Sequence, residues 1–121
     1  MSDEPIAAAD GSAAAAEALT AATINAAWSV GLGEQIGSLE PGKKADLILV
    51  DTRAAHATPM YNVYSQLVYA LKASDVRTVV VAGKIVMEER RMLTLDEKEI
   101  LAKAQEYKKK IEASLAAPTA N

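Results

Sequence analysis

The sequence predicts an α+β fold, in which about three helices accompany one small β-sheet. Three observations support this prediction. Alanine-rich and amphipathic stretches toward the two ends have helical spacing, and runs of β-branched residues lie between them. The length of 121 residues corresponds to about one domain. Half of the residues are apolar, which excludes an intrinsically disordered chain.

The first helix is expected over residues 13–33, after a flexible lead-in at 1–12. Alanine, the best helix former, dominates this segment. Ser12 is expected to be the N-cap, and Gly31 and Gly33 supply a stop signal at the other end.

The region 34–93 is expected to contain the sheet. Residues 36–51 have the pattern of a short strand, a tight turn and a second strand. Residues 40–43, with proline and glycine at the two central positions, suit a type II turn. The continuous apolar run 47–50 predicts a strand that is covered on both faces.

A short helix is expected near residues 62–72, with Asn62 as its N-cap. Residues 75–93 are rich in β-branched side chains and predict a hairpin. Residues 82–83 lie where its two-residue turn belongs. Together with the strands before this helix, the hairpin brings the expected total to four or five strands.

Residues 94–116 predict the clearest helix of the chain. Thr94 and Glu97 match the T-x-x-E capping box, which marks a helix start. Its apolar face comprises Ile100, Ala104, Tyr107, Ile111 and Leu115. The opposite face is charged and is expected to be solvated.

The composition restricts the partners and the compartment. The net charge is −3 with Lys and Arg spread along the chain, so nucleic acid is not an expected partner. No apolar run approaches the ~20 residues of a membrane span, so we expect no membrane partner. The absence of cysteine excludes disulfide and thiolate chemistry, and with an acidic N-terminus it leads us to expect a cytoplasmic protein.

The polar residues do not form a recognisable catalytic set. His56 is the only histidine, whereas a histidine-based metal site needs several ligands, so we expect it to pack in a loop. Asp46 and Asp51 bracket a strand and project to opposite faces, so they should bond nearby backbone N–H groups instead of acting as an acid/base pair. Ser65 and Tyr64 lack a neighbouring histidine base.

Two glycine-containing stretches also fall short of ligand-binding motifs. The G-K-K at 42–44 lacks the spacing of a phosphate-binding loop. Gly31, Gly33 and Gly37 close a helix, whereas a dinucleotide fingerprint opens one. Arg90-Arg91 and the lysines of the last helix are expected to form a solvated face. From its residue types and their spacing alone, we expect the chain to contain no catalytic, cofactor-binding or metal site.

Four motifs carry a resemblance to a known family. They are T-x-N-A-A at 23–27, G-S-L-E-P-G-K-K-A-D-L at 37–47, N-V-Y-S-Q-L-V-Y-A at 62–70 and V-R-T-V-V-V-A-G-K at 76–84. With them, residues 17–115 closely resemble the C-terminal end of the amidohydrolase superfamily. The chain looks most like the branch of chlorohydrolases and aminohydrolases that includes S-adenosylhomocysteine/methylthioadenosine deaminases.

Such enzymes have a metal-bearing (β/α)₈ barrel and a small β-sandwich built from both chain ends. The resemblance implies that 13–33 is the last barrel helix, 34–93 half of the composite sandwich, and 94–116 a terminal helix that packs back on the barrel. The barrel itself would be missing. The family binds zinc or iron through several histidines and an aspartate. Those histidines are absent here, and Asp10 lies too close to the first helix to match that aspartate, so no cofactor is expected in this chain.

Three functional hypotheses follow from the resemblance. The chain could be a structural C-terminal fragment, or a stand-alone remnant, of a metal-dependent hydrolase that acts on C–N bonds, without activity of its own. It could have become a self-associating binding or assembly module. It could also be the non-catalytic subunit of a split hydrolase. The expected partner is therefore a second copy of the chain, or a missing barrel segment or subunit.

Overall fold

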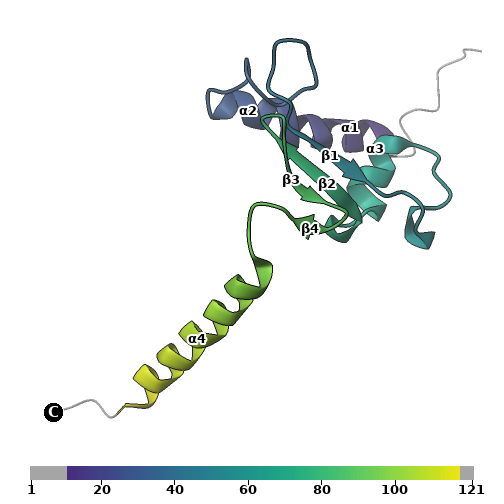
Figure 1. Ribbon diagram of the computed structural model, residues 1–121. Coiled ribbons are helices and arrows are strands. Elements are labelled where there is room, and N and C mark those ends of the chain that lie inside the picture. Colours follow the sequence, from purple (N-terminus) through teal and green to yellow (C-terminus); the bar gives the residue numbers. More distant parts are fainter. Residues whose placement is uncertain (1–10, 118–121) are drawn as a thin grey trace, which may run out of the picture.

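The computed structural model describes residues 11–117 and confirms the α+β fold class (Figure 1). Its sheet has four antiparallel strands in the order β1-β2-β3-β4. The strands are β1 (Leu47–Val50), β2 (Val76–Val81), β3 (Lys84–Glu88) and β4 (Arg91–Met92). The lead-in expected at 1–12 lies outside the described residues, apart from Gly11 and Ser12.

The first helical segment runs without a break through α1, a wider π turn and α2. Its parts are α1 (Ser12–Thr20), the π turn (Ala21–Asn25) and α2 (Ala26–Ser29). The hydroxyls of Thr20 and Thr23 donate to carbonyls four residues earlier, at 2.9 and 2.7 Å, a bonding pattern that often bends helices. Ser12 is wrong as the N-cap, because Gly11 occupies that position. The segment ends at Gly31, whose φ of 76° is left-handed, as expected for a glycine stop signal.

The segment before β1 differs from the prediction. Residues 36–46 form turns and bends, so the short strand expected at the start of 36–51 is wrong. Gly37 has a φ of 95°, and a Cβ there would lie 2.7 Å from the Cβ of Ala27. This close approach curls the chain over the helix instead of extending it beside β1. The type II turn is confirmed, since Gly42 has a φ of 91° and the Lys43 N–H donates to the Glu40 carbonyl.

Two tight turns shape the hairpin region. Ala82 and Gly83 have φ of 50° and 79°, the positive values of a type I′ turn, which confirms the expected hairpin between β2 and β3. A second such turn at Glu89 and Arg90 leads into β4. Arg90 and Arg91 are exposed, which agrees with the solvated face expected for this pair, and the guanidinium of Arg90 also donates to the Val76 carbonyl at 3.0 Å.

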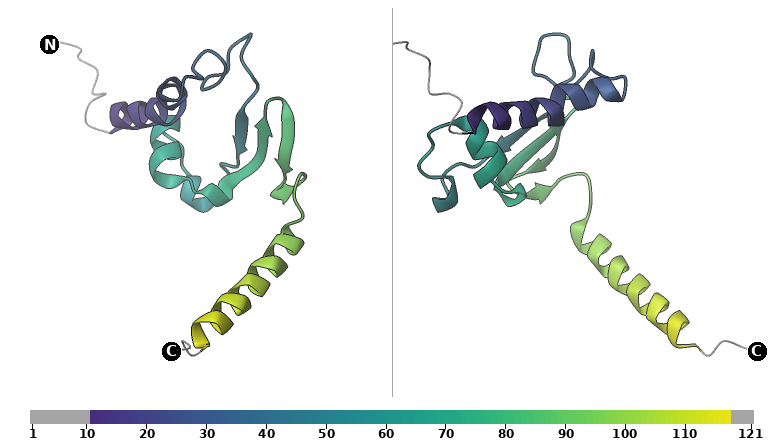
Figure 2. Two further views of the ribbon diagram at one scale, coloured as in Figure 1. Left: turned by 90° about the vertical axis from the view of Figure 1, so that its left-hand side faces the viewer. Right: turned by 180° about the vertical axis from the view of Figure 1, so that it is seen from behind.

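The short helix near 62–72 consists of α3 (Val63–Ser65) and a π turn (Gln66–Ala70). Asn62 is confirmed as its N-cap, since its side chain accepts a hydrogen bond from the Ser65 N–H at 3.0 Å. The helix lies beside α1, and Figure 2 shows the two together on one side of the sheet.

The last helix, α4 (Glu97–Ala116), projects away from the rest of the molecule (Figures 1 and 2). The capping box expected at Thr94 and Glu97 is wrong by two residues. Asp96 is the N-cap, and its carboxylate accepts from the Glu99 N–H at 3.0 Å. All residues of α4 are exposed. No helix among residues 11–117 combines the length and apolar character needed to cross a membrane.

The described chain buries very few apolar side chains. Among residues 11–117 these are Ala15, Ala27, Ala57 and Met87. The prediction that the apolar run 47–50 is covered on both faces is wrong, because Ile48 and Leu49 are 51% and 57% exposed. The chain exposes 9700 Å², whereas a folded monomer of its mass typically exposes about 6300 Å². Apolar surface stays exposed because the helices and strands of this chain do not enclose a hydrophobic core.

Candidate functional site

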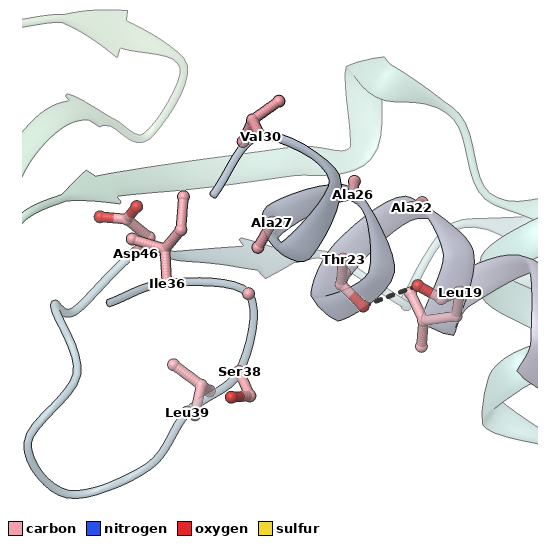
Figure 3. Close-up of a pocket in the computed structure, with 11 residues that line it drawn as sticks. Leu19, Ala22, Thr23, Ala26, Ala27, Val30, Ile36, Ser38, Leu39 and Asp46 are labelled. Carbon is pink, nitrogen blue, oxygen red and sulfur yellow. Dashed lines mark hydrogen bonds between the residues drawn. The ribbon is translucent and has the colours of Figure 1, made fainter. Parts of the chain in front are cut away.

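An apolar groove with a volume of about 610 Å³ lies beside the α1–α2 helix (Figure 3). The segment 36–39 forms its second wall, and Asp46 lies at one end. The helical wall consists of Leu19, Ala22, Thr23, Ala26, Ala27 and Val30. This lining is apolar apart from one carboxylate and two hydroxyls, which suits docking of another apolar surface better than catalysis.

Small side chains make the helical wall shallow. Ala22 and Ala26 are four residues apart, so they share one face of the helix. Thr23 lies between them, and its hydroxyl donates to the Leu19 carbonyl of the same helix, shown as a dashed line in Figure 3. Val30 completes the wall and is 67% exposed. An incoming element could therefore approach the helix backbone closely along this wall.

Lys43 fastens the loop that forms the second wall. Its ammonium donates to the Gly33 carbonyl and the Ser38 hydroxyl, each at 2.7 Å, and pairs with the Glu40 carboxylate at 3.1 Å. The Ser38 hydroxyl donates to Glu40, and this bond, followed by the Lys43 contact, lowers the pKa of Glu40. The ammonium is thus committed within its own loop.

The two aspartates that bracket β1 bond to nearby backbone, as expected. Asp46 accepts from the Ala82 N–H at 2.6 Å and so ties the groove to the β2–β3 turn. Asp51 accepts from the Arg53 N–H at 3.0 Å and from its guanidinium at 2.9 and 2.7 Å. These Arg53 bonds, those of the side chain above all, hold the pKa of Asp51 well below its usual range. The pair has structural contacts and no shared catalytic geometry.

His56 packs in a loop, as predicted, and its partner is Asp75. The Nε2 atom of His56 lies 2.7 Å from Oδ2 of Asp75, which also accepts from the Lys72 N–H at 2.7 Å. The His56 bond, followed by the Lys72 bond, lowers the pKa of the buried Asp75. Sequence reasoning missed Asp75. Its position directly before a β-branched run, where aspartate often closes a turn, is the signal that could have identified it.

A shallower depression of about 320 Å³ lies over β1, β2 and the turn before β4. Its charged residues form two ion pairs, Arg53 with Asp51 at 2.7 Å and Arg77 with Glu89 at 2.6 Å. Such exposed pairs contribute at most about 1 kcal/mol each. Each of the four charges thus has an opposite partner within the depression.

Within 11–117, no group of three or more His, Cys, Asp or Glu side chains could hold a metal ion. The Ser65 hydroxyl is buried, but no hydrogen bond joins it to His56, the base that a serine nucleophile would need. Asp10 lies outside the described residues. The described residues do form an apolar groove, and one of its walls is a loop that the bonds of Lys43 hold in place.

Comparisons with known sequences agree with the resemblance seen in the motifs. The model of the amidohydrolase family matches residues 2–86. The chain is 48% identical over 95 residues to the 5-methylthioadenosine/S-adenosylhomocysteine deaminase of Syntrophomonas wolfei. This alignment covers 78% of this chain and 22% of the relative. It is 46% identical over 91 residues to the 5'-deoxyadenosine deaminase of Methanosarcina barkeri, covering 75% and 21%. The chain thus spans about a fifth of the length of these curated relatives.

Solved structures show the same partial match. An adenosine deaminase from Xanthomonas campestris with bound zinc superposes with a TM-score of 0.80 at 38% identity, over 82% of this chain and 23% of that one. The atrazine chlorohydrolase TrzN from Arthrobacter aurescens, with a TM-score of 0.69 and 23% identity over 84% of this chain and 23% of its own, shares the fold. The similarity therefore concerns one part of much longer proteins.

Proposed function

Because the chain belongs to the amidohydrolase family, we propose that it is the structural, non-catalytic portion of a metal-dependent deaminase. In this proposal a metal-bearing barrel, supplied outside the described residues, packs on the apolar groove and the open face of the sheet. The observation that carries the proposal is the missing core. An apolar-rich chain buries only four apolar side chains among its described residues, three of which are alanines.

The amount of uncovered surface supports a large and permanent interface. The chain exposes 9700 Å², which is more than a compact monomer of this mass typically exposes. Obligate interfaces bury roughly 2000–5000 Å² and resemble a domain core cut in half. Exposed Val30 and Leu39, which both line the groove, fit the apolar side of such an interface.

The available residues do not fit the metal of the zinc-bound neighbour. A catalytic zinc needs three protein ligands, but the single imidazole of the chain is bonded to Asp75. Asp46 and Asp51 are bonded to backbone N–H groups. We therefore assign no step of hydrolysis to this chain. Its contribution is to complete the fold of the hydrolase and hold its shape.

Complementation tests the proposal directly. The chain would be co-expressed with the Syntrophomonas wolfei deaminase from which the matching fifth has been removed. We expect the two to purify together and to deaminate 5-methylthioadenosine, with the metal in the truncated relative. Stoichiometric metal and deaminase turnover in the purified chain alone would contradict the proposal, as would a truncated relative that neither needs nor binds the chain.

Two single variants distinguish binding at the groove from nonspecific association. Val30→Asp places a carboxylate in the groove, where the side chain is 67% exposed, so the chain's own fold should tolerate it. We expect this variant to lose co-purification. The matched control is Tyr61→Asp, at a side chain that is 92% exposed and does not line the groove. This control should bind as the unchanged chain does.

A further inference from the structure

We propose that the barrel surface that fills the apolar groove carries a basic side chain, lysine or arginine, which pairs with Asp46. The partner is the barrel of the proposed function, on which this inference rests. Asp46 lies at one end of the groove and is exposed in this chain (Figure 3). A surface that fills the groove takes this carboxylate out of water, and a charge without water needs another partner.

The two hydroxyls that line the groove already have partners within this chain. The hydroxyl of Thr23 donates to the Leu19 carbonyl at 2.7 Å. The hydroxyl of Ser38 donates to the Glu40 carboxylate and accepts from the Lys43 ammonium, the latter at 2.7 Å. Both hydroxyls keep these hydrogen bonds when the groove is filled, so they require nothing from the barrel.

The carboxylate of Asp46 differs from these hydroxyls. Its Oδ1 atom accepts from the Ala82 N–H at 2.6 Å, and its Oδ2 atom accepts no hydrogen bond from the described residues. A carboxylate offers about four acceptor positions, so most of this capacity stays open. The ion pairs of the described chain do not include Asp46. A negative charge without an opposite charge thus lies at the end of an apolar surface.

The energetics of burial determine what the barrel must supply. Proteins tolerate a buried charge where an opposite charge and hydrogen bonds compensate for its lost hydration. The rest of the lining, which includes Val30, Ile36 and Leu39, is apolar and cannot provide this compensation. The surface that fills the groove must therefore bring the donor. A basic side chain supplies both the opposite charge and the N–H groups.

The Asp46→Asn variant tests the pairing in the complex with the truncated Syntrophomonas wolfei deaminase. Asparagine removes the charge but keeps a carbonyl oxygen that can accept from the Ala82 N–H. The complex would be immobilised through a tag on the truncated relative, and the release of the chain would be followed during washing. We expect the variant to be released more than about tenfold faster than the unchanged chain, because the basic side chain of the barrel is left buried and unpaired.

Three further variants serve as controls. Glu34→Gln removes the same charge at an exposed position that does not line the groove, so its release should be unchanged. Lys44→Met tests whether the exposed lysine two residues before Asp46 supplies the cation instead. We expect its release to be unchanged as well, and a loss as large as that of Asp46→Asn would overturn the pairing with the barrel. Asp46→Ser, whose hydroxyl also accepts hydrogen bonds, replaces Asp46→Asn if circular dichroism shows that variant to be unfolded.

The direction of the change separates the alternatives. Slower release of Asp46→Asn would mean that the carboxylate is covered without a cation, since loss of an unpaired buried charge removes its desolvation cost. Acceleration below about tenfold would mean that Asp46 stays in water or meets a neutral donor. Either result would overturn the pairing and leave the proposed function intact. Failure of the unchanged chain to bind the truncated relative would instead contradict the proposed function, and the pairing with it.

Discussion

The imidazole of His56 and the carboxylate of Asp75 meet at 2.7 Å and fasten the loop before α3 to the start of β2. Asp75 is buried, and its side chain also receives the Lys72 N–H. Two segments that are 19 residues apart in sequence are thereby held together. This contact leads to the first of four predictions.

The Asp75→Asn substitution should lower the thermal unfolding midpoint by several degrees near neutral pH, because it replaces a charged hydrogen-bond acceptor by a neutral one. The pKa of Asp75 is lowered in the folded state. Its stabilising contribution is therefore complete above the unfolded pKa of about 3.9 and is lost as the pH falls through the lower folded value. Thermal scans from pH 7 down to pH 2 should show a weaker acid dependence in the variant. Equal dependence in both proteins would contradict this role.

Removing the ammonium of Lys43 should loosen the groove wall. Lys43→Met keeps the aliphatic stem but loses the bonds to the Gly33 carbonyl and the Ser38 hydroxyl. We expect faster hydrogen exchange at the Lys44 N–H, which bonds to the Gln35 carbonyl across the same loop. The matched control is Lys44→Met at the adjacent exposed lysine, read at the Lys43 N–H, where exchange should stay unchanged.

Gly33→Ala should displace the indole ring of Trp28, because a Cβ at this position would overlap the ring. Trp28 is the only tryptophan, so the change can be read from the emission maximum of the intrinsic fluorescence. Gly42→Ala is the control. It introduces a side chain at a φ of 91° with nothing within 4 Å, so it strains the backbone without touching the ring. An identical emission shift in both variants would contradict the packing argument.

The start of α4 can be tested by removing each candidate cap. Asp96→Ala should destabilise the helix by about 1 kcal/mol, since the carboxylate caps the Glu99 N–H. Thr94→Ala should have almost no effect, because Thr94 lies two residues before the cap. Far-ultraviolet circular dichroism of both variants measures the helical content. A larger loss in Thr94→Ala would restore the T-x-x-E interpretation.

Local sequence signals correctly predicted those elements whose geometry depends on only a few neighbouring residues. Asn62 caps its helix, and Gly42 takes the positive φ of the expected turn. The Ala82-Gly83 turn likewise follows from two residues that accept left-handed backbone. The helix start at 94–97 was ambiguous because Thr94 and Asp96 are each followed three residues later by glutamate. Local pattern alone could not choose between them.

Local sequence patterns could not predict contacts between residues that are distant in the sequence. The strand expected at the start of 36–51 is absent because Gly37 lies against Ala27 of the preceding helix. The position of Asp75 before a β-branched run indicated a turn residue, but only the fold showed that His56 is its partner. The bond from the exposed Arg90 to the Val76 carbonyl depends on the turn into β4, which no local pattern indicated.

The sequence by itself determined the α+β class, the family and the lack of a histidine-rich metal site, because motifs and composition are properties of the chain alone. Only the tertiary structure showed that the apolar run 47–50 stays uncovered and that α4 is exposed along its whole length. The physical reason is that an apolar pattern states which residues tend to be buried, whereas the arrangement of the elements decides whether this chain contains the surface that covers them.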